Sequence, residues 1–69
     1  MDTNPIKAYR AENEVTQIEL ATALGVAQST VASWETGHRP VGAEVVGRVS
    51  SYTGIDLHVL RPDLFPVAA

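Results

Sequence analysis

The chain has 69 residues, enough for a single domain over residues 1–69, and a formal net charge of −3, from five Lys and Arg against eight Asp and Glu. It has no cysteine, which excludes disulfide bonds and thiolate metal sites. No apolar run approaches the roughly 20 residues of a membrane span, and the N-terminus lacks the pattern of a secretory signal, so we expect a cytoplasmic protein with no membrane partner.

The first predicted helix spans about residues 5–12. Thr3 or Asn4 can cap it, and Pro5 suits the first helical position because its missing N–H would be unpaired there anyway. Residues 13–14 read as a turn. We expect the inward side chains of this helix to be Ile6, Tyr9 and Arg10.

Residues 16–37 hold two short apolar repeats separated by a glycine. Thr16 and Glu19 form a capping-box pattern, which predicts a helix from residue 16 or 17 to about residue 24. Gly25 permits the left-handed turn that a residue with a β-carbon resists. A second helix should follow from Gln28 to residue 35 or 36, where Gly37 ends it.

The outer face of this second helix carries no charge, whereas surface helices usually show Glu and Lys there. It offers hydrogen-bonding groups and a methyl, the chemistry that reads base edges in a major groove. Gln28 could pair with adenine or be a solvated glutamine. Ser29, Ala32 and Ser33 could contact bases, or they could simply keep the helix face small enough for its backbone to approach the DNA. These candidate base-contacting residues are Gln28, Ser29, Ala32 and Ser33.

The second half of the chain predicts two further helices and a tail. One helix should span about residues 42–52; its glycines and valines give it a low helix propensity, so tertiary packing must hold it. Asp56 can cap a short last helix, from which Leu57 and Leu60 point inward. Two prolines predict an extended tail over residues 61–69. The valines expected to be buried on the longer helix are Val45, Val46 and Val49.

Residues 16–37 resemble the helix-turn-helix of the Cro and repressor N-terminal domains of lambdoid phages and of the wider group of Xre-type bacterial regulators. The family pattern T-Q-x-E-L-A-x-x-L-G-V-x-x-S-T-V-x-x-W-E-x-G matches at nearly every fixed position. Ala27 departs from it, because the family usually has a capping Ser or Thr there. The resemblance implies an all-α fold, a compact bundle of five short helices of the lambda-repressor type. Residues 60–66, LRPDLFP, more weakly resemble the tail of small Cro-like and YdaS-type regulators.

The resemblance also implies roles for individual residues. Arg10 and Glu35 match positions that pair in the phage repressor branch, which implies a partly buried structural ion pair rather than DNA contacts. Other positions match or adjoin phosphate contacts of the family, although His38 can equally be a loop histidine and Lys7 a solvated lysine. The candidate phosphate-contacting residues are Gln17, Thr30, His38, Arg39 and Lys7.

The leading hypothesis is a sequence-specific repressor of the Cro kind, encoded by a phage or its bacterial host, that binds a palindromic operator. An acidic chain should bind DNA weakly as a single copy, because affinity comes largely from neutralised phosphates, so we expect a weak homodimer or a dimer formed on DNA. Phe65 could instead fold back over its own helices. The candidate dimer contacts are Leu57, Val59, Leu60, Leu64, Phe65 and Val67.

A second hypothesis is an antitoxin of the YdaS type, which acts mainly by binding a toxin protein. The acidic balance and the apolar tail fit this function. We do not expect an enzyme, because the sequence has no Ser/His/Asp constellation, metal-ligand spacing or phosphate loop. We therefore expect no cofactor and no metal. His58 has no ligand-spaced companion, and Trp34 is expected in the core.

Overall fold

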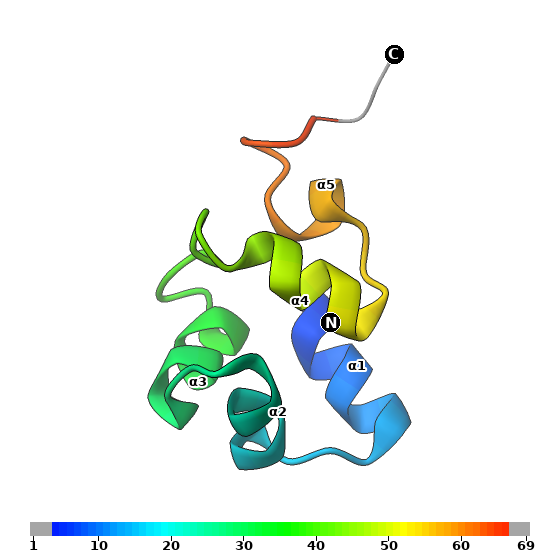
Figure 1. Ribbon diagram of the computed structural model, residues 1–69, viewed down its shortest axis with the longest axis vertical. Helices are drawn as coiled ribbons and strands as arrows, with labels where there is room; N and C mark the ends of the chain where they lie inside the picture. The colour runs from blue at the N-terminus through cyan, green and yellow to red at the C-terminus, as the bar shows by residue number, and fades with distance from the viewer. Residues whose placement is uncertain (1–3, 67–69) are drawn as a thin grey trace. The chain divides into compact units, whose positions relative to one another are not determined.

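The structure is a computed structural model that describes residues 4–66 and, within them, contains five helices and no strand. The helices are α1 (Pro5–Asn13), α2 (Gln17–Leu24), α3 (Gln28–Thr36), α4 (Val46–Thr53) and α5 (Leu57–Leu60), as Figure 1 shows. The predicted all-α class is confirmed. Within residues 4–66 no helix has the length and apolar character of a membrane span.

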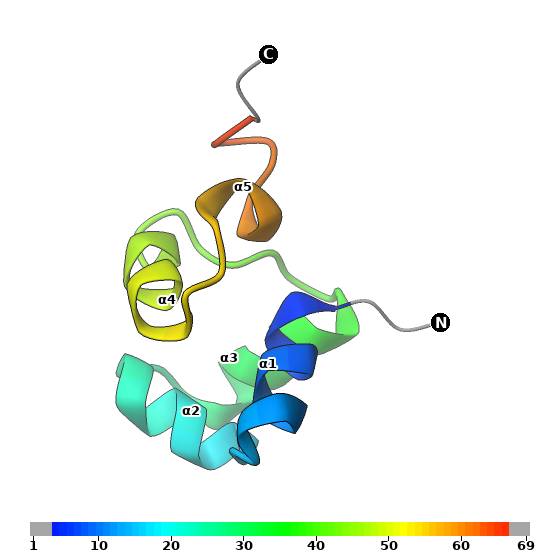
Figure 2. The same cartoon turned by 90° about the vertical axis from the view of Figure 1, so that its right-hand side faces the viewer.

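The chain divides into two compact units, Met1–Arg39 and Pro40–Ala69. In the first unit α3 packs against both α1 and α2, and in the second α4 packs against α5 (Figure 2). The single domain expected over residues 1–69 stays a prediction. Two of the predicted residues, Thr3 and Val67, lie outside the described part of the chain.

Asn4 caps α1 and also ties it to α3. Its side-chain oxygen accepts hydrogen bonds from the N–H groups of Ile6 and Lys7, both at 3.0 Å, and its amide nitrogen donates to the carbonyl of Trp34 at 2.9 Å. The helix runs one residue further than predicted, to Asn13. Asn4 therefore sets where α1 starts and holds this end against α3.

The turn between α2 and α3 follows from local chemistry. Both bonds of the predicted capping box are present: the Thr16 hydroxyl accepts from the N–H of Glu19 at 3.1 Å, and the N–H of Thr16 donates to the Glu19 carboxylate at 2.9 Å. Gly25 ends α2 with a φ of 74°, a left-handed conformation that glycine adopts at little cost. This turn fixes the point from which α3 leaves.

Helix α3 runs from Gln28 to Thr36, as predicted, and Gly37 caps its end. Ala27 at its N-cap makes no side-chain capping bond, as its methyl side chain requires. Helical spacing places Val31 and Trp34 on the buried side. The buried apolar residues of the first unit are Ile6, Leu20, Ala21, Leu24, Val31 and Trp34.

The predicted start of α4 at residue 42 is wrong, because the helix begins at Val46. The N–H groups of Val45 and Val46 both bond to the carbonyl of Gly42, at 3.0 and 2.9 Å, and close a turn over residues 43–45. Val45 has φ −120° and ψ −8°, well away from helical values, so the regular helix starts only after it. The three valines expected in the core are buried, with Val45, Val46 and Val49 at 7%, 2% and 0% exposure.

Two expectations for the last residues are wrong. Asp56 precedes α5 but makes no side-chain capping bond. Residues 61–65 turn instead of extending, because the N–H groups of Leu64 and Phe65 bond to the carbonyl of Arg61 at 3.1 and 2.9 Å. Pro62 fits this turn, since its fixed φ is that of the second turn position.

Arg61 joins the start of the second unit to its end. Its Nη1 donates to the carbonyl of Val41 at 2.5 Å, while Nε and Nη2 donate to the Asp63 carboxylate at 2.9 and 2.7 Å. The Arg61 hydrogen bonds lower the pKa of Asp63 to about 2. The ion pair therefore keeps the guanidinium oriented toward Val41 over the ordinary pH range.

Candidate functional site

The candidate site lies on the outward side of α3, next to the start of α2. Gln28 and Ser29 are exposed, and Ala32 and Ser33 are half-buried. None of these four side chains is charged. The structure thus places the four predicted base-contacting residues on one helix, with the core residues of α3 turned away from them.

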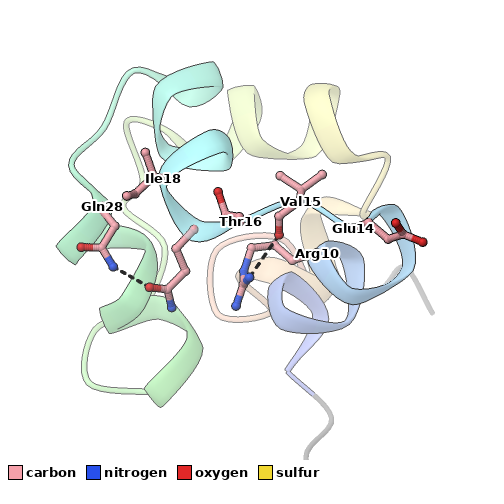
Figure 3. A pocket seen from close by; sticks show the side chains of 7 residues that line it. Arg10, Glu14, Val15, Thr16, Ile18 and Gln28 are labelled. Carbon is pink, nitrogen blue, oxygen red and sulfur yellow. Dashed lines mark hydrogen bonds between the residues drawn. The ribbon is translucent and has the colours of Figure 1, made fainter.

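Gln28 is the end of a chain of side-chain hydrogen bonds that starts in the interior of the first unit. Its Nε2 donates to Oε1 of Gln17 at 2.5 Å, a bond drawn in Figure 3. The Nε2 of Gln17 donates in turn to Oε1 of Glu35 at 3.0 Å. The chain joins the first residues of α2 and α3 to a carboxylate further along α3.

The ionised Glu35 carboxylate fixes the direction of every bond in this chain, because it can only accept. Gln17 must turn its amide nitrogen toward Glu35, which leaves its oxygen facing Gln28. Gln28 must then donate, and this uses one of its two amide hydrogens. The second hydrogen and the oxygen remain for a ligand, and these are the two groups that pair with N7 and N6 of adenine.

Arg10 holds the Glu35 carboxylate in place. Its Nε and Nη2 donate to the two carboxylate oxygens at 2.5 and 2.8 Å, and its Nη1 donates to the carbonyl of Val15 at 3.1 Å. Only 5% of the Glu35 side chain is exposed. The hydrogen bond from Arg10 lowers the pKa of Glu35, against burial, and the bond from Gln17 adds to the lowering. Glu35 therefore stays an anion that accepts.

The predicted phosphate-contacting residues lie on four segments of the first unit. Gln17 and Thr30, both half-buried, belong to the first turns of α2 and α3, and Lys7 is exposed on α1. His38 and Arg39 are exposed in the loop after Gly37, where their N–H groups bond to the carbonyl of Ser33 at 3.0 and 3.3 Å. The same turn that ends α3 therefore holds the loop that carries Arg39.

Sequence reasoning missed a surface hollow of about 420 Å³ beside Gln28 (Figure 3). Ile18, which directly follows the predicted contact residue Gln17, lines this hollow and is 66% exposed. A signal was available: Leu20 and Leu24 define the buried side of α2, and helical spacing turns residue 18 away from it. The described residues that line the hollow are Arg10, Glu14, Val15, Thr16, Gln17, Ile18 and Gln28.

The predicted dimer contacts differ in exposure. Leu64 and Phe65 are 43% and 38% exposed, and Val59 on α5 is 45% exposed. Leu60 is wrong as a surface contact, because it faces inward from α5 and is only 9% exposed. Within residues 4–66 no group of three or more His, Cys, Asp or Glu side chains could hold a metal ion.

The sequence model of a helix-turn-helix family matches residues 6–60, which is most of the chain and extends from α1 to α5. No curated protein and no solved structure matches the chain significantly.

Proposed function

The chain belongs to this helix-turn-helix family of DNA-binding transcription regulators, and we propose that it is a Cro-like repressor that reads a palindromic operator with α3. One observation carries the proposal: Gln28 stands at the start of α3 with its amide oriented by Gln17. In helix-turn-helix proteins the first residues of the motif's second helix, here α3, contact base edges in the major groove.

In this proposal Gln28 forms a bidentate pair with adenine, which is worth about 1–3 kcal/mol of discrimination against other bases. The orientation is set before DNA arrives, so no free energy is spent on choosing between the two amide rotamers. Ser29 and Ser33 offer hydroxyls that accept or donate, and Ala32 offers a methyl suited to the methyl of thymine. These three residues sharpen the preference, and Gln28 dominates it.

The phosphate contacts are proposed for Gln17, Thr30, Lys7, His38 and Arg39. With a net charge of −3, few cations are available to neutralise phosphate, so one copy should bind poorly. We propose that two copies bind adjacent half-sites, with their recognition helices ~34 Å apart. The exposed Val59, Leu64 and Phe65 of the second unit supply apolar surface for the contact between the copies.

Selection from a random DNA library tests this function. The wild-type chain should enrich one palindrome, with a preference over random duplex of at least about 10³. Gln28→Ala should change the preferred base at one position in each half-site, while Ser51→Ala, an exposed polar residue on α4, should leave the consensus unchanged. An identical consensus for wild type and Gln28→Ala would contradict the assignment.

The YdaS-type antitoxin remains the second candidate, favoured by the acidic charge and by the exposed apolar side chains near the C-terminal turn. Such a protein could bind DNA with little preference when alone. The same selection separates the two functions: an enriched palindrome supports the repressor, and its absence supports a role carried mainly by a protein partner.

A further inference from the structure

Ile18 is the most exposed large hydrophobic side chain among residues 4–66, with 66% of its surface accessible. It follows Gln17 on α2, on the side of the helix opposite the buried Leu20 and Leu24. Burial of such a side chain is favourable, and Ile18 gains little of this stabilisation in the free chain. A partner that covers it would gain that contribution.

The surroundings of Ile18 indicate what that partner is. Ile18 and Gln28 line the same surface hollow from two different helices, and Figure 3 shows both side chains at one side of it. A base that pairs with Gln28 therefore lies within reach of Ile18. Through Gln28 the hollow adjoins the face of α3 that is proposed above to read bases.

The charges around the hollow disfavour a phosphate on Ile18 itself, although the neighbouring Gln17 is proposed above to contact one. Of the described residues that line the hollow, Arg10 and Glu14 are charged. Arg10 is already paired with Glu35, and Glu14 would repel an anion. What remains is an apolar lining, formed in part by Val15 and Ile18, beside the amides of the two glutamines.

We infer that Ile18 packs against an apolar group of the nucleotide next to the base pair read by Gln28, and so contributes to the affinity for DNA. This inference rests on the proposed operator binding. DNA offers two apolar groups there, the C5-methyl of thymine in the major groove and the carbons of the deoxyribose. Contact with the methyl selects thymine, and contact with the sugar strengthens binding to every sequence.

The affinity of Ile18→Ala for the selected operator tests the inference. The substitution removes three carbons from the contact, so at about 0.8 kcal/mol per buried carbon we expect binding to weaken at least tenfold. Thr22→Ala, also exposed and one turn further along α2, is the control and should change affinity less than twofold. Equal unfolding midpoints for the wild type and Ile18→Ala would show that the exposed side chain acts through DNA and not through folding.

Operators with uracil in place of thymine beside the Gln28 contact distinguish the two apolar groups. If Ile18 touches the methyl, uracil weakens the wild type, and Ile18→Ala weakens binding to the uracil duplex no further. If it touches the sugar, Ile18→Ala weakens binding equally on both duplexes. Affinity of Ile18→Ala within twofold of wild type on both duplexes would overturn the inference.

Parallel measurements on Gln28→Ala separate this inference from the proposed function. A changed consensus for Gln28→Ala together with unchanged binding by Ile18→Ala overturns the role of Ile18 alone. Selection of no sequence by the wild-type chain overturns both.

Discussion

Arg10 on α1 and Glu35 on α3 form a two-bond ion pair, with nitrogen–oxygen distances of 2.5 and 2.8 Å. The same carboxylate also accepts a hydrogen bond from Gln17, which in turn accepts one from Gln28. One anionic group therefore holds two helices together and orients the side chain proposed to read a base. Glu35 therefore contributes both to the stability of the fold and to the proposed recognition of DNA.

Removing only one partner of this pair should be costly. We expect Arg10→Met to destabilise the chain by about 3 kcal/mol, because it leaves the nearly buried Glu35 carboxylate unpaired. The double variant Arg10→Met with Glu35→Leu should recover much of the loss, since an apolar pair is often tolerated. Urea unfolding of the four proteins gives the coupling energy. A coupling energy near zero would mean that the pair contributes nothing to stability.

Acid should weaken the fold through its paired carboxylates. Folding lowers the pKa of Glu35 below its ordinary 4.5, so its contribution is complete above that pH and is lost as the pH falls through the folded value. The contribution of Asp63 is lost between pH 3.8 and about 2. We expect urea midpoints to fall below pH 4.5 in the wild type and to fall less in Arg10→Met with Glu35→Leu. Equal pH slopes for the two proteins would contradict this origin of the acid sensitivity.

Glu14 is strained at the end of α1, and relieving this strain should stabilise the chain. It is the one non-glycine residue with positive φ among those described, at φ 54° and ψ 46°. Glu14→Gly should add about 0.5–1 kcal/mol, because glycine reaches this conformation without a clash. Glu12→Gly, inside α1, removes the same charge and should instead destabilise by about 1 kcal/mol. The same sign for both variants in thermal unfolding would show that charge, and not φ, decides the effect.

Helix α3 lacks a cap that a single substitution can restore. Ala27 has the extended backbone of an N-cap, with φ −75° and ψ 151°, but no oxygen to accept a bond. Ala27→Ser should raise the free energy of unfolding by about 1 kcal/mol. Ala23→Ser, exposed within α2, is the control and should be neutral or slightly destabilising, since serine is a weaker helix former than alanine. No gain for Ala27→Ser would mean that water already satisfies the first turn of α3.

Arg39 should act on DNA through charge alone. Arg39→Ala is expected to weaken binding to all sequences similarly and to reduce the slope of log affinity against log salt by about one. Arg48→Ala on α4 changes the net charge equally and should leave the slope unchanged. A slope that is the same for wild type and Arg39→Ala would show that Arg39 does not touch phosphate.

The sequence predicted those parts of the fold that depend on neighbours along the chain. The capping bond of Asn4, the capping box of Thr16 and Glu19 and the left-handed Gly25 are all local, and all appear where expected. The predicted start of α4 and the predicted extended tail were wrong, although the bonds that decide them are local too: backbone N–H groups bond to the carbonyls of Gly42 and Arg61, and no residue type specifies this. The guanidinium of Arg61 adds a long-range bond that the sequence could not show, because it reaches Val41 across 20 positions of the chain.

Of the candidate site, too, only some features could be predicted from the sequence. Helical spacing was enough to place Gln28 and Ser33 on one outward face of α3. It could not show that the side chain of Gln17 orients Gln28. This orientation depends on the hydrogen bond from Gln17 to the carboxylate of Glu35, 18 residues further along the chain. It also gave no weight to Ile18, whose importance depends on a hollow lined by residues of α1, α2 and α3.

Trp34 gives the protein a built-in optical reporter. It is the single tryptophan of the chain, it is only 5% exposed, and it lies on α3 between the half-buried Ser33 and Glu35. Its carbonyl also receives the hydrogen bond from Asn4, so the indole belongs to the part of α3 that is fastened to α1. Unfolding must bring this ring into water. Its intrinsic fluorescence can therefore follow every stability measurement above without an attached dye, in a chain that has no cysteine to label.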